Sequence, residues 1–226
     1  MRLSYSTIAN TLQPQNSHNF VNKNILGLKP EERPEWKEGK VAHDIIQKHV
    51  SGRQPHMVLS KVKELDDVKF PIVETKDFDP KCRIEVSLNK LFPNKTDFEH
   101  DYTLLGFIDG RDEEWTRGLE IKTSSNLWSL MKFKKAMQRK VYCFAVPTLK
   151  SMTLITTPRN EMEWASIKPK VYTVPTTEKD KIDAMNWILA AIALLQSGDF
   201  TGGLNEDGIC TDKWCYFGRN CSFKRG

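Results

Sequence analysis

The chain has 226 residues, of which 39% are hydrophobic and 28% are charged, and its formal net charge is +5. This composition is ordinary for a globular protein, and the sequence has no apolar run of the about 18 residues that a membrane-spanning helix needs. Its start also lacks the apolar segment of a signal peptide. We therefore expect an intracellular, cytoplasmic protein. The mild basic excess suits a polyanionic partner without identifying one.

The first half of the sequence predicts two helices followed by strands. Residues 1–34 are polar, and a short helix is expected to begin at Ser4 or Ser6. After Pro34, apolar and small residues recur three and four positions apart, as one face of a helix running to about Val50 requires: Trp36, Gly39, His43, Ile46 and Val50. Residues 57–103 read as strands with charged loops, and Ile84, Val86 and Leu88 alternate as in a strand.

The second half of the sequence predicts an alternation of strands and helices. Two strong strands are expected over residues 103–110 and 118–124, and the short charged loop between them is typical of an antiparallel hairpin. A helix, two strands and a second, apolar helix are then expected over residues 126–144, 152–157, 170–174 and 178–195. Ser197-Gly198 is expected to end the last helix.

Two carboxylates and a lysine converge in the predicted hairpin. Glu120 and Lys122 are two positions apart on one strand and therefore share a face, and the hairpin folds Asp109 back beside Glu120. Such neighbouring carboxylates are costly unless a cation lies between them, and oxygen ligands favour Mg²⁺ or Mn²⁺. The pattern predicts metal-dependent attack of water on a phosphodiester. Lys122 would orient the water and stabilise charge on the phosphate oxygens.

Four short motifs follow one another in a recognisable order: G-x-x-x-H at 39–43, G-F-I-D at 106–109, L-E-I-K-T-S at 119–124 and Q-x-x-x-Y at 138–142. Each is weak alone, but the ordered set is specific. It resembles the PD-(D/E)XK nuclease superfamily in its RecB-like branch, over roughly residues 4–221. The resemblance implies an α/β fold, with a restriction-endonuclease-like core whose central mixed sheet is flanked by helices.

The resemblance also assigns roles to the residues that match the motifs. Asp109 and Glu120 would bind the metal through their side chains, and Ile121 would bind it through its backbone carbonyl. His43 would be a further metal ligand, and Lys122 would be the catalytic lysine. A histidine on an apolar helical stripe is more often a core residue, and this alternative stays open for His43.

The predicted helix over 126–144 is rich in basic residues and has almost no acidic ones. By the resemblance, Gln138 and Tyr142 would lie beside the site and either contact DNA or brace the lysine. Lys135 shares their helical face and Arg139 flanks it, so both are expected to contact phosphates without reading sequence. A solvated basic helix face is the alternative interpretation.

Three of the five cysteines, Cys210, Cys215 and Cys221, lie within the last 17 residues. Several RecB-like nucleases hold an iron–sulfur cluster with one N-terminal and three C-terminal cysteines. Here Asp212 stands where the family has its first C-terminal cysteine, and Gln13 stands where the N-terminal one would be. Because a cluster normally needs four thiolates and structural zinc needs four ligands, we expect neither an Fe–S cluster nor zinc here. The tail would instead be packed by aromatic side chains.

The sequence thus predicts a single nuclease domain over residues 1–226, with residues 1–34 and 198–226 as appendages to its core. We expect a Mg²⁺- or Mn²⁺-dependent deoxyribonuclease, exonucleolytic in action, in recombination, repair or phage DNA metabolism. A small stand-alone nuclease of this branch suits a phage or mobile-element product. The alternatives are a non-catalytic DNA-binding module that keeps the fold and a subunit that cuts only within a larger complex.

Overall fold

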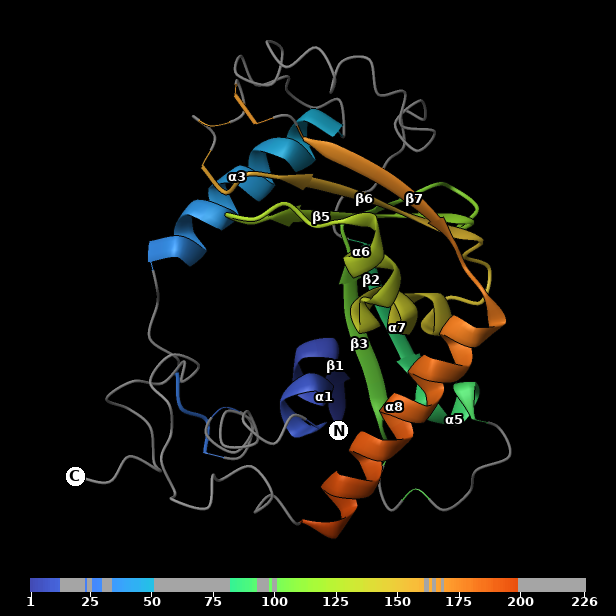
Figure 1. The fold of residues 1–226 in the computed structure, drawn as a ribbon. Helices are drawn as coiled ribbons and strands as arrows, with labels where there is room; N and C mark the ends of the chain where they lie inside the picture. Colours follow the sequence, from blue (N-terminus) through green and yellow to red (C-terminus); the bar gives the residue numbers. More distant parts are fainter. Residues whose placement is uncertain are drawn as a thin grey trace, which may run out of the picture. The chain divides into compact units, whose positions relative to one another are not determined.

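The computed structural model of the chain is drawn in Figure 1. It describes residues 1–12, 23, 26–29, 34–50, 82–92, 98, 101–160, 163, 166–167 and 169–198. The strands expected between residues 57 and 81 and the three tail cysteines lie outside these ranges. The chain divides into two compact units, Met1–Glu32 with Glu85–Leu105 and Asp183–Gly226, and Arg33–Ile84 with Gly106–Ile182. The expectation of a single domain stays a prediction.

The first unit contains the N-terminal strand and helix. Strand β1 (Arg2–Ser4) pairs in parallel with the first half of β3 (Thr103–Ile108). Helix α1 (Tyr5–Leu12) follows directly, which confirms the short helix expected from Ser4 or Ser6. The Ser4 hydroxyl accepts a hydrogen bond from the main-chain N–H of Thr7 at 3.1 Å, as a residue that caps a helix N-terminus does.

The three-stranded sheet has the order β1-β3-β2. Strand β2 (Cys82–Ser87) alternates as expected at its start, where Ile84 is buried and its neighbours on either side are exposed. The expected strand ends earlier than predicted, because Leu88 begins the short helix α5 (Leu88–Leu91). The main-chain N–H of Leu88 donates to the carbonyl of Tyr102 at 2.9 Å, and the Leu88 side chain is fully buried.

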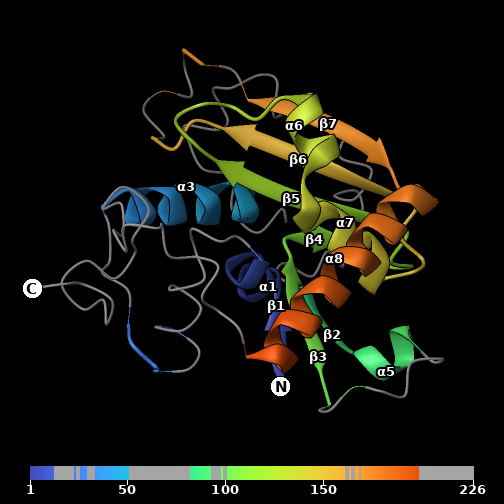
Figure 2. The ribbon, with the colours of Figure 1, turned by 60° about the horizontal axis from the view of Figure 1, so that its bottom comes forward.

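The second unit holds a four-stranded mixed sheet of order β4-β5-β6-β7, seen side by side in Figure 2. In chain order its strands are β4 (Gly110–Arg111), β5 (Arg117–Thr123), β6 (Ser151–Thr157) and β7 (Lys170–Pro175). The central pair β5 and β6 is parallel, and the two outer pairs are antiparallel. The expected strands over 152–157 and 170–174 are therefore confirmed.

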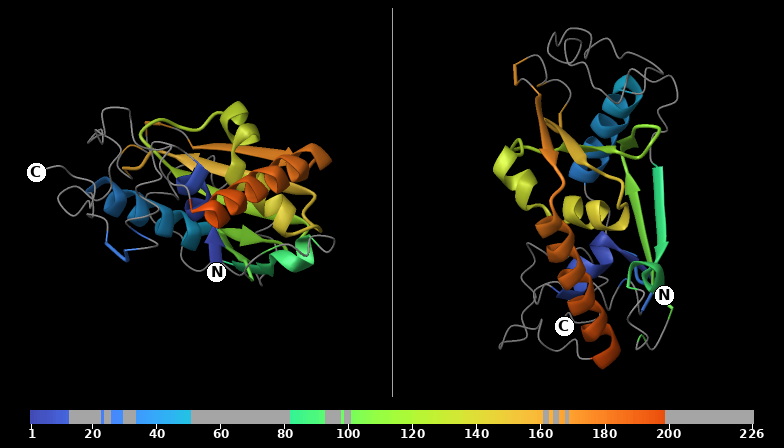
Figure 3. Two further views of the ribbon diagram at one scale, coloured as in Figure 1. Left: turned by 90° about the horizontal axis from the view of Figure 1, so that it is seen from below. Right: turned by 90° about the vertical axis from the view of Figure 1, so that its right-hand side faces the viewer.

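Helices cover both faces of this sheet, as a parallel pair of strands requires. Helix α3 (Pro34–Val50) packs on one face, where its Gly39 carbonyl accepts a hydrogen bond from Thr123 of β5 at 3.1 Å. Helices α6 (Leu130–Lys135) and α7 (Met137–Ala145) cover the other face (Figure 3, right). They connect β5 to β6, because parallel neighbours need a crossover. The helix expected over Pro34 to about Val50 is confirmed.

The predicted hairpin is much shorter than expected. Strand β3 ends at Ile108 and belongs to the three-stranded sheet, so only Gly110 and Arg111 pair with β5. The chain bends at Asp109, whose main-chain N–H still donates to the carbonyl of Leu119 at 3.1 Å. The described strands thus form two sheets where the sequence had predicted one central mixed sheet.

The prediction of a single helix over residues 126–144 is wrong, because the structure has two helices, α6 and α7, separated by one extended residue. Ala136 has φ −63° and ψ 118°, outside the helical region. The guanidinium of Arg139 donates to the carbonyl of Lys134 at 2.9 Å, which satisfies one of the acceptors that the end of α6 leaves open. The break is therefore stabilised by a side chain of the following helix.

The last helix, α8 (Glu178–Ser197), confirms the apolar helix expected from Glu178. It begins with a capping box: the Thr177 hydroxyl accepts from the N–H of Asp180 at 3.2 Å, and the Asp180 carboxylate accepts from the N–H of Thr177 at 3.1 Å. It ends at Gly198, whose φ of +66° suits a glycine after a helix. In the described part of the chain, no helix is long and apolar enough to cross a membrane.

Candidate active site

Asp109 lies at the bend between β3 and β4, at the edge of β5 that the short strand β4 leaves uncovered. Its Oδ2 accepts the main-chain N–H of Ile121 at 2.7 Å, so the carboxylate takes the place of a neighbouring strand. Its Oδ1 lies 3.1 Å from Nε2 of His43. The main chain of β5 thereby fixes the position of the Asp109 side chain.

His43 reaches Asp109 from helix α3. The other ring nitrogen, Nδ1, lies 3.8 Å from Oδ1 of Asp44. Burial lowers the pKa of His43, but the hydrogen bond and charge of Asp109, with the charges of Asp44 and Glu120, raise it by more, so the net pKa lies above the ordinary value. The histidine that the G-x-x-x-H motif singles out therefore contacts the carboxylate that the second motif singles out.

Gln47 is a residue of this neighbourhood that the sequence analysis missed. It lies one helical turn after His43 on α3 and is 5% exposed. Its Nε2 donates a hydrogen bond to the main-chain carbonyl of Asp109 at 2.9 Å. The spacing of four residues from His43 is the signal that could have identified it.

Glu120 and Lys122 lie on the same face of β5, as their spacing predicts. Glu120 is 5% exposed, and its Oε1 forms an ion pair with Nζ of Lys122. The other carboxylate oxygen, Oε2, is buried and has no hydrogen-bond partner among the described residues. Burial raises the pKa of Glu120 to about 7, against the opposing charge of Lys122 and with a further contribution from Asp109.

A chain of hydrogen bonds holds Lys122 from the α7 side. Lys122 Nζ donates to Oε1 of Gln138 at 2.8 Å, and Nε2 of Gln138 donates to the hydroxyl of Tyr142 at 2.9 Å. That hydroxyl donates in turn to the carbonyl of Phe107 at 2.8 Å. A Cβ on Gly106 would lie 3.0 Å from the Tyr142 ring, so glycine makes room for it. Of the two roles left open for these residues, the geometry favours bracing the lysine.

Arg139 is buried and has to be removed from the predicted DNA-contacting residues. Its side chain is 2% exposed, and Nη2 lies 2.5 Å from Oδ1 of Asp180. Among the described residues, Nε and Nη1 of Arg139 have no hydrogen-bond partner. The predicted helical face placed it at the surface because that prediction assumed one continuous helix. Lys135 is exposed at the end of α6 and stays available for phosphate contacts.

The side chains around Asp109 and Glu120 match the preferences of a hard divalent cation in type. Two carboxylates, one imidazole and the main chain of Ile121 offer oxygen and nitrogen donors, and within the described part of the chain the buried Oε2 of Glu120 has no hydrogen-bond partner. Within the described residues, however, no three His, Cys, Asp or Glu side chains are arranged as a ready metal site. Asp109 is turned toward His43, and Glu120 is turned toward Lys122.

No family model matches the sequence, and no curated protein matches it. Among solved structures, the fold is similar to that of a protein from Eubacterium rectale that is provisionally called an exonuclease. The TM-score is 0.55 at 8% identity, over 87% of this chain and 82% of that chain. A second similarity, to LHK-Exo in complex with dAMP, has a TM-score of 0.49 at 10% identity, over 87% of this chain and 88% of that one. The first similarity shows a shared fold, and the second is too weak to add to it.

Proposed function

We propose that this protein is a metal-dependent deoxyribonuclease of the PD-(D/E)XK type. Asp109, Glu120 and Lys122 would form the site that hydrolyses the phosphodiester bonds of DNA. The observation that carries the proposal is the buried Oε2 of Glu120, which has no hydrogen-bond partner among the described residues although a second carboxylate and an ammonium group lie beside it. Lys122 pairs with the other oxygen, Oε1, and a buried carboxylate oxygen that has neither a donor nor a cation is costly. The fold shared with the Eubacterium rectale protein, whose name is that of an exonuclease, supports the same class.

The cation would be held by the side chains of Asp109 and Glu120 and by the carbonyl of Ile121, with His43 as a further ligand. Mg²⁺ or Mn²⁺ bound there would supply a water of lowered pKa and would screen the charge of the phosphodiester. The raised pKa of Glu120 supports this set, because part of the rise comes from the charge of Asp109. Binding would require the Asp109 carboxylate to turn away from His43 or to be shared with it.

Lys122 would orient the attacking water and stabilise the charge that develops on the phosphate oxygens. Gln138 limits the movement of the Lys122 ammonium group, because Gln138 accepts a hydrogen bond from Lys122 Nζ. Gln138 is itself held by its hydrogen bond to Tyr142. A lysine side chain has many rotamers, so this bracing lowers the entropic cost of presenting it. Exposed Lys135 would contact the DNA backbone. We propose exonucleolytic cutting in recombination, repair or phage DNA metabolism as the setting.

The test is cleavage by the purified chain. DNA labelled at the 5′ or the 3′ end, as single strands, duplexes and closed circles, is incubated with Mg²⁺, Mn²⁺ or EDTA. We expect linear DNA to be shortened in the presence of either metal and to stay intact with EDTA. DNA binding without cleavage in both metals would contradict the proposal and would identify a binding module. Cleavage that persists in EDTA would contradict the metal dependence of the proposed activity.

A further inference from the structure

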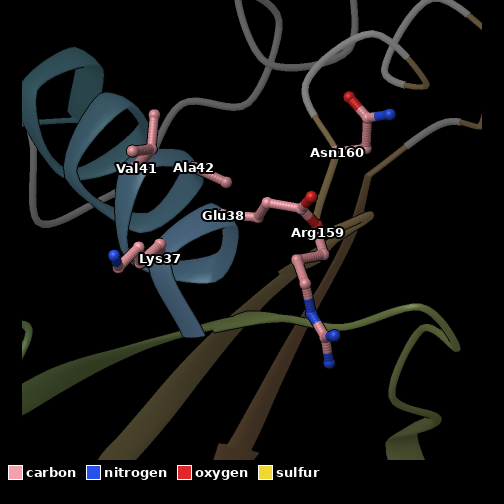
Figure 4. A pocket seen from close by; sticks show the side chains of 6 residues that line it. All are labelled: Lys37, Glu38, Val41, Ala42, Arg159 and Asn160. Carbon is pink, nitrogen blue, oxygen red and sulfur yellow. The ribbon is translucent and has the colours of Figure 1, made fainter. Parts of the chain in front are cut away.

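A pocket lies beside the candidate site, between α3 and the segment that follows β6 (Figure 4). Its volume is about 350 Å³, at the lower end of the range of about 300–1,000 Å³ for small-molecule sites. The residues that line it are Lys37, Glu38, Val41, Ala42, Arg159 and Asn160. Val41 and Ala42 occupy variable positions of the G-x-x-x-H motif, but none of the lining residues is a defining residue of the four motifs, and the proposed reaction uses none of them.

The pocket lies at the carboxyl ends of two parallel strands. Strands β5 and β6 end in register, with Thr123 opposite Thr157, and the chain continues from β6 to Arg159. The aliphatic part of Arg159 passes over α3, where a Cβ added to Gly39 would lie 3.7 Å from its Cγ. The crevice outside the carboxyl ends of parallel strands is where open α/β sheets bind ligands.

Helix α3 contributes residues to both the pocket and the candidate site, and β5 contacts this helix beside the pocket. On α3, Gly39 precedes His43 by four residues, which corresponds to about 6 Å along the helix axis. On β5, Thr123 directly follows Lys122 and donates to the carbonyl of Gly39 at 3.1 Å. A strand of DNA that runs over α3 could therefore contact the pocket within a few nucleotides of the scissile bond.

The charges of the lining suit an internal phosphate of a nucleic-acid strand. Lys37 and Arg159 are cationic, Glu38 extends from α3 toward Arg159, and the three leave one net positive charge. A phosphodiester carries one negative charge, which this lining would neutralise, whereas a terminal phosphate carries about −1.5 to −2 at pH 7 and would leave the filled pocket with a net negative charge. Val41, 55% exposed, adds an apolar surface for a sugar or base. The planar fork of an arginine is well suited to phosphate oxygens.

We propose that this pocket binds an internal backbone phosphate of the DNA strand, close to the bond that is cut, through Arg159 and Lys37. The inference deepens the proposed function and rests on it for the identity of the ligand. It makes Arg159 a residue of substrate binding and keeps it apart from the groups that touch the reacting atoms. The pocket would thereby fix the register of the strand over Asp109 and Glu120.

The test measures binding separately from cleavage. Fluorescence anisotropy with a labelled single-stranded oligonucleotide in EDTA gives Kd, and cleavage with Mn²⁺ gives KM and kcat, for wild type, Arg159→Ala, Arg159→Lys and Lys37→Ala. Lys150→Ala, an exposed lysine just before the opposite end of β6, is the matched control for the loss of one charge. We expect Arg159→Ala to raise Kd and KM about tenfold with a much smaller change in kcat, and Lys150→Ala to resemble wild type.

The outcomes separate this inference from the proposed function. Equal Kd values for Arg159→Ala and Lys150→Ala, with both proteins melting like wild type, would overturn the pocket even if the wild type cuts DNA. A 5′-phosphate that tightens wild-type binding about tenfold, but not that of Arg159→Ala, would also overturn it, since the pocket would then hold a strand end. If Arg159→Ala has a lower melting temperature than wild type, the Kd of Lys37→Ala, a variant on the exposed face of α3, is compared with that of Lys150→Ala instead. If the wild type binds DNA through Arg159 but does not cut it, the result would support the proposed phosphate pocket and contradict the proposed nuclease activity.

Discussion

Gln47 of helix α3 donates a hydrogen bond to the main-chain carbonyl of Asp109, 2.9 Å away. Helix α3 therefore fixes Asp109 twice, because His43, one turn earlier, lies 3.1 Å from the Asp109 side chain. The bend that ends β3 and begins β4 is thereby held to a helix as well as to β5. This contact thus helps to set the position of the carboxylate on which the proposed chemistry depends.

The first prediction concerns this contact. Gln47→Leu keeps the volume of the side chain but leaves the Asp109 carbonyl without its donor, which costs about 1–3 kcal/mol for a buried acceptor. We expect a lower melting temperature together with a fall in kcat, while KM changes little, because Gln47 positions Asp109 and does not contact DNA. Lys40→Ala, on an exposed position of the same helix, is the control. A stability loss with an unaltered kcat would reduce Gln47 to a purely structural residue.

The second prediction separates the metal ligands from the lysine. Asp109→Ala, Glu120→Ala and Lys122→Ala should each lower cleavage at least about 100-fold while the protein stays folded. The first two should also lose Mn²⁺ binding by calorimetry, whereas Lys122→Ala should keep it. Glu113→Ala removes an exposed carboxylate from the loop between β4 and β5 and is expected to behave as wild type. A variant that cuts at a near wild-type rate would remove that residue from the site.

The convergence of these three residues could be predicted because it depends on local spacing. Alternation along β5 places Glu120 and Lys122 on one face, and a turn of any kind after Ile108 brings Asp109 to the start of the neighbouring strand. Helices α3 and α8 were predictable for the same reason, since their apolar periodicity and end signals lie within a few residues. The structure differs from the expectation in how long the hairpin is, and the short version suffices to bring the residues together.

What the sequence could not predict depends on partners far away in the chain. The break at Ala136 is stabilised by Arg139, which donates to the end of α6 and pairs with Asp180, 41 residues further on. The early end of the hairpin follows from β3, whose first half pairs in parallel with the N-terminal strand β1. Neither a basic residue in a helix nor a strand of six residues carries a local sign of such a partner, so the predicted surface position of Arg139 was wrong.

A third prediction tests whether Tyr142 braces the lysine or contacts DNA. Tyr142→Phe removes the hydroxyl that connects Gln138 to the carbonyl of Phe107, and the part-buried hydrogen bond to that carbonyl is lost. We expect kcat to fall several-fold and stability by about 0.5–1.5 kcal/mol, with KM unchanged. Gln138→Leu should lower kcat as well, and the double variant should be no worse than Gln138→Leu alone, because both act on Lys122. A rise in KM without a change in kcat would favour DNA contact.

The fourth prediction is a pH dependence of stability that arises at Asp180. Burial raises the pKa of this carboxyl, but hydrogen bonds from Arg139 and Thr177 lower it by more, so its folded pKa lies below the ordinary value. A depressed pKa contributes stability that is fully present above the unfolded pKa of about 3.9 and is lost as the pH falls through the folded pKa. We therefore expect the melting temperature of the wild type to decline steeply in acid below about pH 4.

Asp180→Asn supplies the comparison. At pH 7 it leaves the buried guanidinium of Arg139 without a counter-charge, which costs about 3–5 kcal/mol. Its melting temperature should therefore lie below that of the wild type at pH 7, and the difference should shrink as the pH is lowered past the folded pKa. A difference that stays constant from neutral to acid pH would show that the charge of Asp180 does not stabilise the fold.

The last prediction concerns the choice of metal and depends on His43. An imidazole is a poor partner for Mg²⁺, which prefers oxygen ligands in near-ideal octahedral geometry, whereas Mn²⁺ accepts nitrogen more readily. If His43 binds the metal, activity at equal concentration should be higher with Mn²⁺ than with Mg²⁺. His43→Ala should then narrow that difference, because it removes the ligand responsible. Titration of both ions against wild type and variant gives the two ratios.

Melting curves of the same two proteins distinguish a ligand from a core residue. A histidine that only packs in the core would lose thermal stability on replacement and leave the Mn²⁺/Mg²⁺ ratio unaltered. Its side chain is 21% exposed and faces the Asp109 carboxylate, which is the position of a ligand as well as of an ion-pair partner. His43→Gln, which keeps a hydrogen-bond donor toward Asp109, separates these two roles. It should restore stability without restoring the preference for Mn²⁺, because its amide oxygen is a hard ligand that suits Mg²⁺ equally well.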